Sequence, residues 1–192
     1  MTLHTAPSPS TPCRLGERIQ DVLWLMTLGA AWRGLESGEP ITGSQILQAA
    51  RVPSLSCSPC PDVIVACLEE MLRCDCLIGD PCQGLTITGQ GKEVFARLMG
   101  EPAASLRIGA GRLAVRVRLA FLDLLDGEAR CAALDALIAA AEDDLALLST
   151  GLNESAWSGP FGGSWAVRDM ASASQDLRTL GSLRSLLATA AA

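Results

Sequence analysis

The 192-residue chain is long enough for one large domain or two small ones, each with its own hydrophobic core. A net charge of -6 is unlike that of a general polyanion binder, so contact with nucleic acid would require a local basic patch. Every apolar stretch is interrupted by Arg, Asp or Glu before it reaches the roughly 18 residues that a membrane span needs. The composition therefore predicts a soluble, cytoplasmic protein with no membrane contact.

The N-terminal residues 1–16 are rich in Thr, Ser and Pro and lack the basic start and apolar core of a signal peptide. We expect them to form a disordered lead-in. This segment contains His4, the only histidine, so a histidine-based catalytic triad or a multi-histidine metal site is excluded. The acidic run 142–144 is expected to lie on an exposed helix face. The sequence thus predicts neither an enzyme nor a cofactor.

Three helices are predicted in the first half of the chain. Apolar residues recur at helical spacing over residues 18–32, and Gly34 together with the segment 37–40 should end that helix. Thr42 is a plausible N-cap for a short helix over residues 43–50. Pro61 fits the first turn of a third helix over residues 61–72, whose apolar positions repeat at three and four. Ile46 and Leu47 give the short helix an inward apolar face, which the first half of a helix-turn-helix requires.

A small hairpin should follow the third helix. Residues 76–79 and 85–87 are strand-like, and the segment 80–84, DPCQG, has turn chemistry. Thr88 is then the expected N-cap of a helix that runs to Met99. The predicted fold is mainly α, with a winged helix-turn-helix and its two-stranded wing over residues 17–100.

The second half predicts a helical dimerisation domain over residues 105–192, after a linker at 100–104. One helix should extend through residues 113–125 to a break at Gly127, a second over 128–148, and a last over 165–190 after a loop at 151–163. Their apolar surface exceeds what a thin helical layer can hide, so we expect a homodimer. The residues expected at the dimer interface are Leu119, Leu122, Leu134, Leu137, Ile138, Leu177, Leu180 and Leu183.

Three segments carry a resemblance to a known family. They are CPDVIVACL at residues 60–68, LTITGQG at 85–91, and the leucine-rich stretch 112–148. In this pattern the chain resembles the PadR family of bacterial transcriptional regulators with a C-terminal helical region of the virulence-activator type. The resemblance implies a recognition helix, a wing and a dimerisation region, in a homodimer that binds double-stranded DNA and responds to an effector or a stress.

Phosphates and base edges would be contacted by polar side chains around the expected recognition helix. They are Thr42, Ser44, Gln45, Arg51, Ser56, Ser58, Arg73, Gln83 and Lys92. Glu69 and Glu70, however, stand where basic side chains are common in the family, and carboxylates repel phosphates. The alternative is a winged-helix dimer that acts through a protein partner or as a thiol sensor.

Cysteines supply the thiols for that alternative. Cys57 and Cys60, followed by Cys74 and Cys76, have the spacing of a zinc site, but an intervening helix would separate the two pairs by about 20 Å. No metal site is therefore predicted. Cys60, Cys67 and Cys74 share one helical face, for which apolar packing is the commoner explanation. Cys57 and Cys60 remain the candidate redox pair.

Two further groups could carry function. Trp24, Phe121 and Trp165 could line an effector pocket between the wing domain and the C-terminal helices. The basic cluster Arg107, Arg112, Arg116 and Arg118 is expected to pair with residues 142–144 across the dimer, with DNA contact as the alternative.

Overall fold

The computed structural model describes residues 19–50, 60–103, 105–107, 109–154 and 160–190. This part of the chain is mainly helical, with one small antiparallel sheet of two strands. No helix in these ranges is both long and apolar enough to cross a membrane. The elements in chain order are α1 (Ile19–Ser37), α2 (Gly43–Ala50), α3 (Pro61–Arg73), β1 (Leu77–Asp80), β2 (Gly84–Ile87), α4 (Gly89–Gly100), α5 (Gly109–Ala120), the 3-10 turn η1 (Leu122–Leu124), α6 (Gly127–Glu154) and α7 (Pro160–Ala190).

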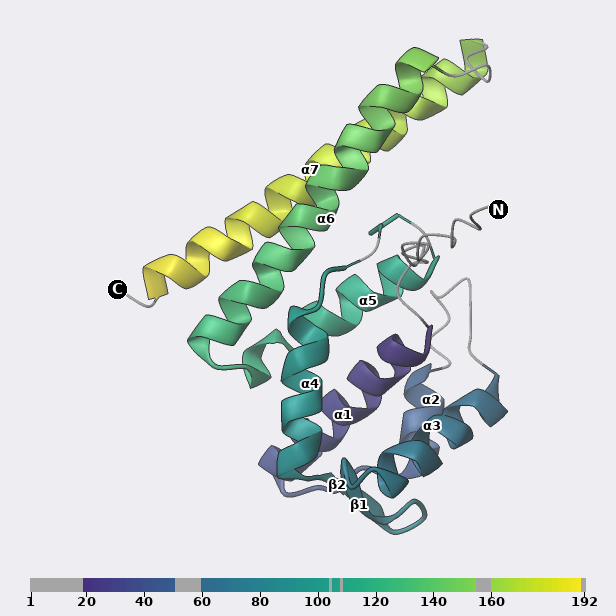
Figure 1. Ribbon diagram of the computed structural model, residues 1–192, viewed down its shortest axis with the longest axis vertical. Coiled ribbons are helices and arrows are strands. Elements are labelled where there is room, and N and C mark those ends of the chain that lie inside the picture. Colours follow the sequence, from purple (N-terminus) through teal and green to yellow (C-terminus); the bar gives the residue numbers. More distant parts are fainter. Residues whose placement is uncertain (1–18, 51–59, 104, 108, 155–159, 191–192) are drawn as a thin grey trace, which may run out of the picture.

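Figure 1 shows α1 to α5 and the hairpin grouped together, with α6 and α7 forming a long antiparallel pair beside them. Helix α1 lies at the centre of the group and contacts α3, α4, α5 and β2. Val22, Leu25 and Leu28 on α1 are at most 1% exposed. Burial of this helix on several sides therefore positions the elements around it.

Helix α1 continues through Gly34 to Ser37, so its predicted end near Trp32 is wrong. The helix ends instead at Gly38, whose φ of 74° lies in the left-handed region that favours glycine. Gly34 then accepts a hydrogen bond from the Glu39 N–H at 2.8 Å. A Cβ on Gly34 would lie 2.5 Å from the Glu39 carbonyl oxygen, so glycine allows the chain to fold back at this point.

The hairpin forms as predicted, with Leu77 paired to Ile87 in antiparallel register. Leu77, Leu85 and Ile87 are buried, whereas Ile78 is 56% exposed. This alternation follows from the two-residue period of a strand. One face of the hairpin therefore joins the core and the other faces solvent.

The hairpin is also tied to the start of α2, which the sequence did not predict. Ile41 forms an isolated bridge with Leu85, whose N–H donates to the Ile41 carbonyl at 2.8 Å. The Gly43 N–H donates to the Pro81 carbonyl at 2.7 Å. A single bridging residue has no periodicity that a sequence pattern could reveal.

Thr88 caps α4, as predicted. Its Oγ accepts the Gly91 N–H at 3.0 Å and donates to the Asp75 carbonyl at 2.6 Å. One hydroxyl thus joins the start of α4 to the turn between α3 and β1. The ring of the buried Phe95 then packs edge-on between Trp32 and Phe121, with centroid distances of 5.6 and 6.4 Å.

Helix α5 ends at Ala120, so the prediction of one helix as far as residue 125 is wrong. Phe121 leaves the helix with φ near -119°, and η1 follows it. The physical reason is the Phe121 ring, which lies so close to Gly29 that a Cβ there would be 2.6 Å from it. A straight helix would carry this ring away from α1.

The apolar core of the N-terminal helices continues across the expected linker at 100–104. It includes Leu113 and Val117 of α5 and Ala133 of α6. Arg118, only 1% exposed, donates from Nη1 to the Glu101 carbonyl at 2.9 Å and so joins α5 to the end of α4. The two expected domains therefore share packing.

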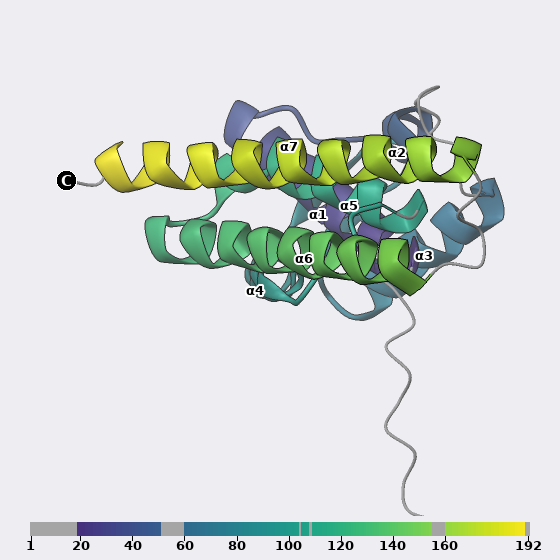
Figure 2. The same cartoon turned by 90° about the horizontal axis from the view of Figure 1, so that it is seen from above.

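Figure 2 shows α6 and α7 lying side by side over the N-terminal group. Their shared core includes Leu134, Leu137 and Leu180, all at most 3% exposed. The loop predicted over residues 151–163 is too long at both ends, because α6 reaches Glu154 and α7 begins at Pro160. Proline fits a first helical position, where its missing N–H costs no hydrogen bond.

The close approach of α4 to β1 gives a stability test. A Cβ on Gly91 would lie 2.1 Å from the Cys76 carbonyl oxygen, whereas one on Gly89 would meet nothing within 4 Å. Gly91→Ala should lower the free energy of unfolding by about 1–3 kcal/mol, as overpacking does. Gly89→Ala, in the same helical turn, should leave it unchanged or slightly raise it. Urea unfolding followed by circular dichroism measures both, and equal effects would contradict the packing described.

Candidate functional site

The candidate site is the exposed face of α3 together with the hairpin and the start of α2. Ile64, Cys67 and Met71 on α3 are at most 4% exposed and pack into the core. The opposite side of this helix exposes Asp62 and Glu69. Its apolar spacing therefore leaves one full helix face in solvent.

The only basic side chain on α3 is Arg73, and it is paired on its own helix. Arg73 forms a hydrogen-bonded ion pair with Glu70, one turn earlier. The Arg73 guanidinium, and next the Cys74 thiol that donates to Glu70 at 3.4 Å, hold the pKa of the Glu70 carboxyl below its usual range. The charge of Arg73 is thus balanced locally and contributes little attraction for phosphate.

The predicted polar contacts at the start of α2 bond to one another. Thr42 donates its N–H to Gln45 Oε1 at 2.8 Å, and Gln45 returns its N–H to Thr42 Oγ at 3.3 Å. Ser44 Oγ lies 2.9 Å from Thr42 Oγ. This reciprocal arrangement is a capping box, which stabilises the first turn of α2. The three side chains nevertheless remain at the surface.

On the hairpin and α4, the predicted contacts also have neighbours. Gln83 is exposed in the turn, where Asp80 accepts the N–H groups of Cys82 and Gln83 at 2.7 and 3.2 Å. The Lys92 ammonium lies 4.6 Å from the centroid of the Trp32 ring, a cation–π contact. Three other predicted contacts, Arg51, Ser56 and Ser58, lie outside the described residues.

The exposed surface of α3 and the hairpin is acidic and apolar. Its exposed acids include Asp62, Glu69 and Asp80. Its exposed apolar side chains are Val63, Val65 and Ile78, which are 40–56% accessible. The predicted contacts that lie on α2, α3 and the hairpin are therefore accompanied by exposed negative charge.

The described thiols are free and differ in exposure. Cys60 and Cys82 are exposed, whereas Cys67 and Cys76 are buried. Burial raises the pKa of the Cys67 and Cys76 thiols, and the hydrogen bond to Glu70 is the largest cause that raises the pKa of Cys74. Cys57, the expected partner of Cys60 in a redox pair, lies outside the described residues.

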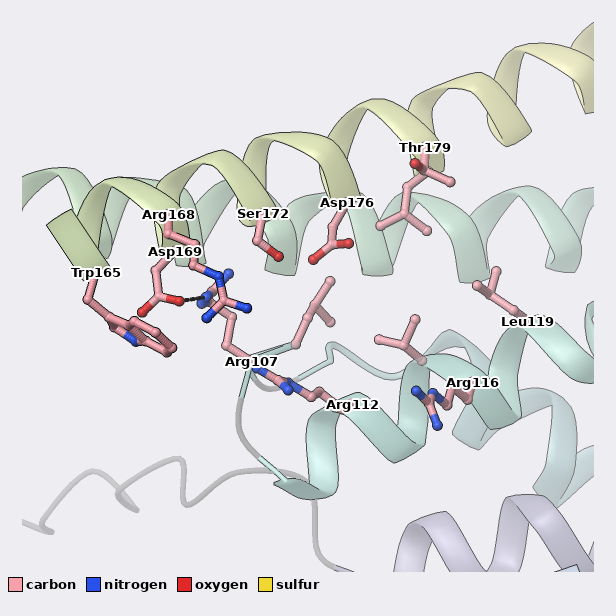
Figure 3. A pocket seen from close by; sticks show the side chains of 13 residues that line it. Arg107, Arg112, Arg116, Leu119, Trp165, Arg168, Asp169, Ser172, Asp176 and Thr179 are labelled. Atoms are coloured by element: carbon pink, nitrogen blue, oxygen red, sulfur yellow. Dashed lines mark hydrogen bonds and ion pairs between the residues drawn. The ribbon is translucent and has the colours of Figure 1, made fainter. Parts of the chain in front are cut away.

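The three predicted pocket aromatics lie in two different surroundings. Trp165 lines a pocket of about 810 Å³ whose walls come from α5, α7 and the segment before α5. Trp24 and Phe121 instead pack against the N-terminal core. Figure 3 shows Trp165 on α7 opposite Arg112 and Arg116 of α5. Residues this far apart in sequence have no pattern that would have indicated this pocket.

The predicted arginine cluster is divided by the fold. Arg107 pairs with Asp169 of the same chain, Nη2 to Oδ1 at 2.9 Å, and Arg118 is buried, so intersubunit pairing is wrong for both. Arg112 and Arg116 line the pocket. Asp144 is only 6% exposed and accepts the Leu106 N–H at 2.8 Å, which corrects the prediction that it lies on a solvated face.

The predicted dimerisation residues are mostly covered within the chain. Leu134, Leu137 and Leu180 are buried between α6 and α7, so they are not available to a second copy. The other five, Leu119, Leu122, Ile138, Leu177 and Leu183, are half-buried against these cores. The large apolar side chains on the described parts of α6 and α7 that are 60–89% exposed are Leu147, Phe161, Trp165, Val167 and Leu186. Phe161 was missed because it falls in the predicted loop.

In the described ranges, no group of three or more His, Cys, Asp or Glu is placed to hold a metal ion. The groups exposed on α3, the hairpin and the start of α2 are hydroxyls, amides, carboxylates, apolar side chains, the Arg73 guanidinium and the thiols of Cys60 and Cys82. No protein-family model and no curated protein matches the chain.

The burial of the thiols predicts their order of reactivity. In a pulse of iodoacetamide at pH 8, Cys60 and Cys82 should be alkylated before Cys67 and Cys76, by about tenfold or more, because burial and raised pKa values reduce access and thiolate content. Mass spectrometry of peptides measures the rates. Unfolding in urea should remove the difference, and a Cys67 that reacts as fast as Cys82 in the folded protein would contradict its burial.

Proposed function

We propose that this chain is a homodimeric transcription regulator of the PadR-like winged-helix type that contacts double-stranded DNA through α3 and the hairpin. The observation that carries the proposal is the placement of α3. Its apolar side packs on α1, its other side lies entirely in solvent, and the hairpin projects next to it (Figure 1). A recognition helix needs such a free face to enter a major groove, with a neighbouring element to contact the backbone.

Uncharged donors would supply most of the DNA contacts. Ser44 and Gln83 are exposed at the start of α2 and in the hairpin turn, which the Gly43–Pro81 hydrogen bond joins, while Arg73 and Lys92 already have partners. Affinity for duplex DNA rises with the number of phosphates that cations neutralise, so each subunit would bind weakly. Two subunits acting together would be required, which links DNA binding to dimerisation.

Exposed apolar side chains on α6 and α7 support the homodimer. Phe161, at the start of α7, is 89% exposed. Leu147 and Leu186, on α6 and α7, are 70% and 65% exposed. Apolar side chains gathered on one helical pair are typical of a surface that a partner covers.

A second function is favoured by the acidic and apolar surface of α3. Val63 and Val65 are exposed next to Asp62 and Glu69, and Arg73 is neutralised by Glu70. Such a surface suits a protein segment with basic and apolar side chains better than it suits phosphates. In that case the winged helix would act by docking a protein partner instead of reading DNA.

Binding to a random duplex distinguishes the two functions. The wild-type protein should bind at low salt and lose affinity as salt rises, while Asp62→Lys combined with Glu69→Lys should strengthen binding and steepen the slope of log K against log salt by about 2 for each bound subunit. Glu70 is left unchanged because it holds Arg73 and Cys74. Fluorescence anisotropy at several salt concentrations measures the slopes.

The control is Glu36→Lys with Glu93→Lys, which makes the same change in net charge at exposed positions on α1 and α4. It should alter the slope much less. If the wild-type protein does not bind duplex DNA even at low salt while the Asp62/Glu69 variant does, the DNA function is refuted and protein docking is favoured.

The proposed dimer surface predicts that substitutions on it lower the mass of the protein in solution. Phe161→Ser combined with Leu186→Ser should raise the dimer dissociation constant by at least about a hundredfold, since each buried apolar side chain is worth about 1.5–3 kcal/mol. Leu35→Ser, at an exposed leucine of α1 outside this surface, should have little effect. Sedimentation velocity over a range of concentrations measures the masses. A wild-type protein that stays monomeric throughout would refute the dimer.

A further inference from the structure

Four arginines line the pocket between α5 and α7. Arg107 precedes α5, Arg112 and Arg116 lie on α5, and Arg168 lies on α7. Two carboxylates, Asp169 and Asp176, also line the pocket, so its charged groups are four cations and two anions with a balance of +2. This positive hollow belongs to a chain whose net charge is -6.

The arginines of the pocket differ in what their guanidinium groups contact, and Arg112 is available to bind a ligand. Arg107 is paired with Asp169 at 2.9 Å and is 17% exposed, so it forms a fixed part of the wall. The Arg168 guanidinium lies 4.3 Å from the centroid of the Trp165 ring and is oriented by it. Within the described residues, Arg112 has no hydrogen bond or ion pair, although it is exposed at the pocket.

The opposite wall adds groups that can complete an anion site. Figure 3 shows Ser172 and Asp176 extending from α7 toward the side where Arg107 and Arg112 lie. The Ser172 hydroxyl can donate to a bound oxygen, and a guanidinium can bind two oxygens of a carboxylate or phosphate in parallel. Asp176 is the one lining carboxylate without a partner in the described structure, and it repels an anion placed on its own side. The anion should therefore lie nearer Arg112 and Arg168.

Apart from Thr179, the rest of the lining is apolar. Leu106, Val115, Leu119 and Leu180 form walls around the charged groups, and Trp165 offers a flat ring at one end. An inorganic ion would leave most of a pocket of about 810 Å³ empty. The mixture of guanidinium groups and apolar walls fits a ligand with one charged end and one apolar body.

We propose that this pocket binds a small organic anion, with a carboxylate or phosphate group on Arg112 and Arg168 and an apolar or aromatic body against Trp165. The guanidinium groups of the pocket repel one another, and a bound anion reduces that repulsion. Asp144 fixes one wall by accepting the Leu106 N–H at 2.8 Å, so the pocket is largely formed before the ligand binds. The proposal does not depend on DNA binding.

The first experiment uses 1-anilinonaphthalene-8-sulfonate, a fluorescent aromatic anion, as the probe. It should bind with one site per chain, and Arg112→Gln or Arg168→Gln should each weaken its affinity by about tenfold, as expected for loss of a charge-assisted hydrogen bond. N-phenyl-1-naphthylamine has the same rings without the sulfonate. Its affinity should change less than twofold in the same variants, because only the charge has been lost.

The control variant is Arg178→Gln, which removes an exposed arginine from the same helix outside the pocket. It should bind the anionic probe like the wild-type protein. Thermal unfolding by circular dichroism should give equal midpoints for all three variants, which separates loss of the site from loss of the fold. An anionic probe affinity that falls equally in Arg112→Gln and Arg178→Gln would overturn the proposal.

Displacement identifies the charged group of the ligand. Benzoate and phenyl phosphate should compete with the bound probe, and the stronger competitor shows whether the site prefers a carboxylate or a phosphate. Failure of both to compete would overturn the proposal. So would a probe affinity that falls as protein concentration rises, because a second copy of the chain would then be occupying the pocket.

Discussion

Burial of helix α1 on several sides is the constraint on which the rest of the structure depends. Val22, Leu25 and Leu28 are almost fully buried, and the helix contacts α3, α4, α5 and β2 at once. Helix α3 and the hairpin pack on α1, and so does α5. The packing of α1 therefore sets the positions of the exposed α3 face and of the α5–α7 pocket. The exposed face of α3 and the wall of the α5–α7 pocket are thus outer sides of elements attached to one core.

Charge is distributed unevenly over these two surfaces. The face of α3 keeps its one cation, Arg73, in a local pair with Glu70, while Asp62 and Glu69 remain exposed. The pocket by contrast gathers four arginines and leaves Arg112 without a partner among the described residues. Anions should therefore be attracted to the second half of the chain more than to the expected recognition helix. This division favours a protein in which ligand and macromolecule are bound at different places.

Local chemistry in the sequence predicted the elements around the candidate site well. Thr88 caps α4, Pro61 begins α3 and the DPCQG turn closes the hairpin, because each of these effects acts within a few residues. Where an element ended through contact with a distant residue, prediction failed. The end of α5 depends on the Phe121 ring packing against Gly29, and Ile41 reaches Leu85 across a long separation in sequence.

The sequence by itself determined the order of the helices and strands, the caps, and the apolar face on which each helix packs. Only the tertiary structure decided what the charged and aromatic side chains contact. Arg107 faces Asp169, Asp144 is buried on the Leu106 N–H, and Trp165 lies over a pocket instead of joining Trp24 and Phe121. Periodicity fixes only the direction in which a side chain leaves its own helix. Its partner depends on how separate helices pack, which a one-dimensional pattern does not contain.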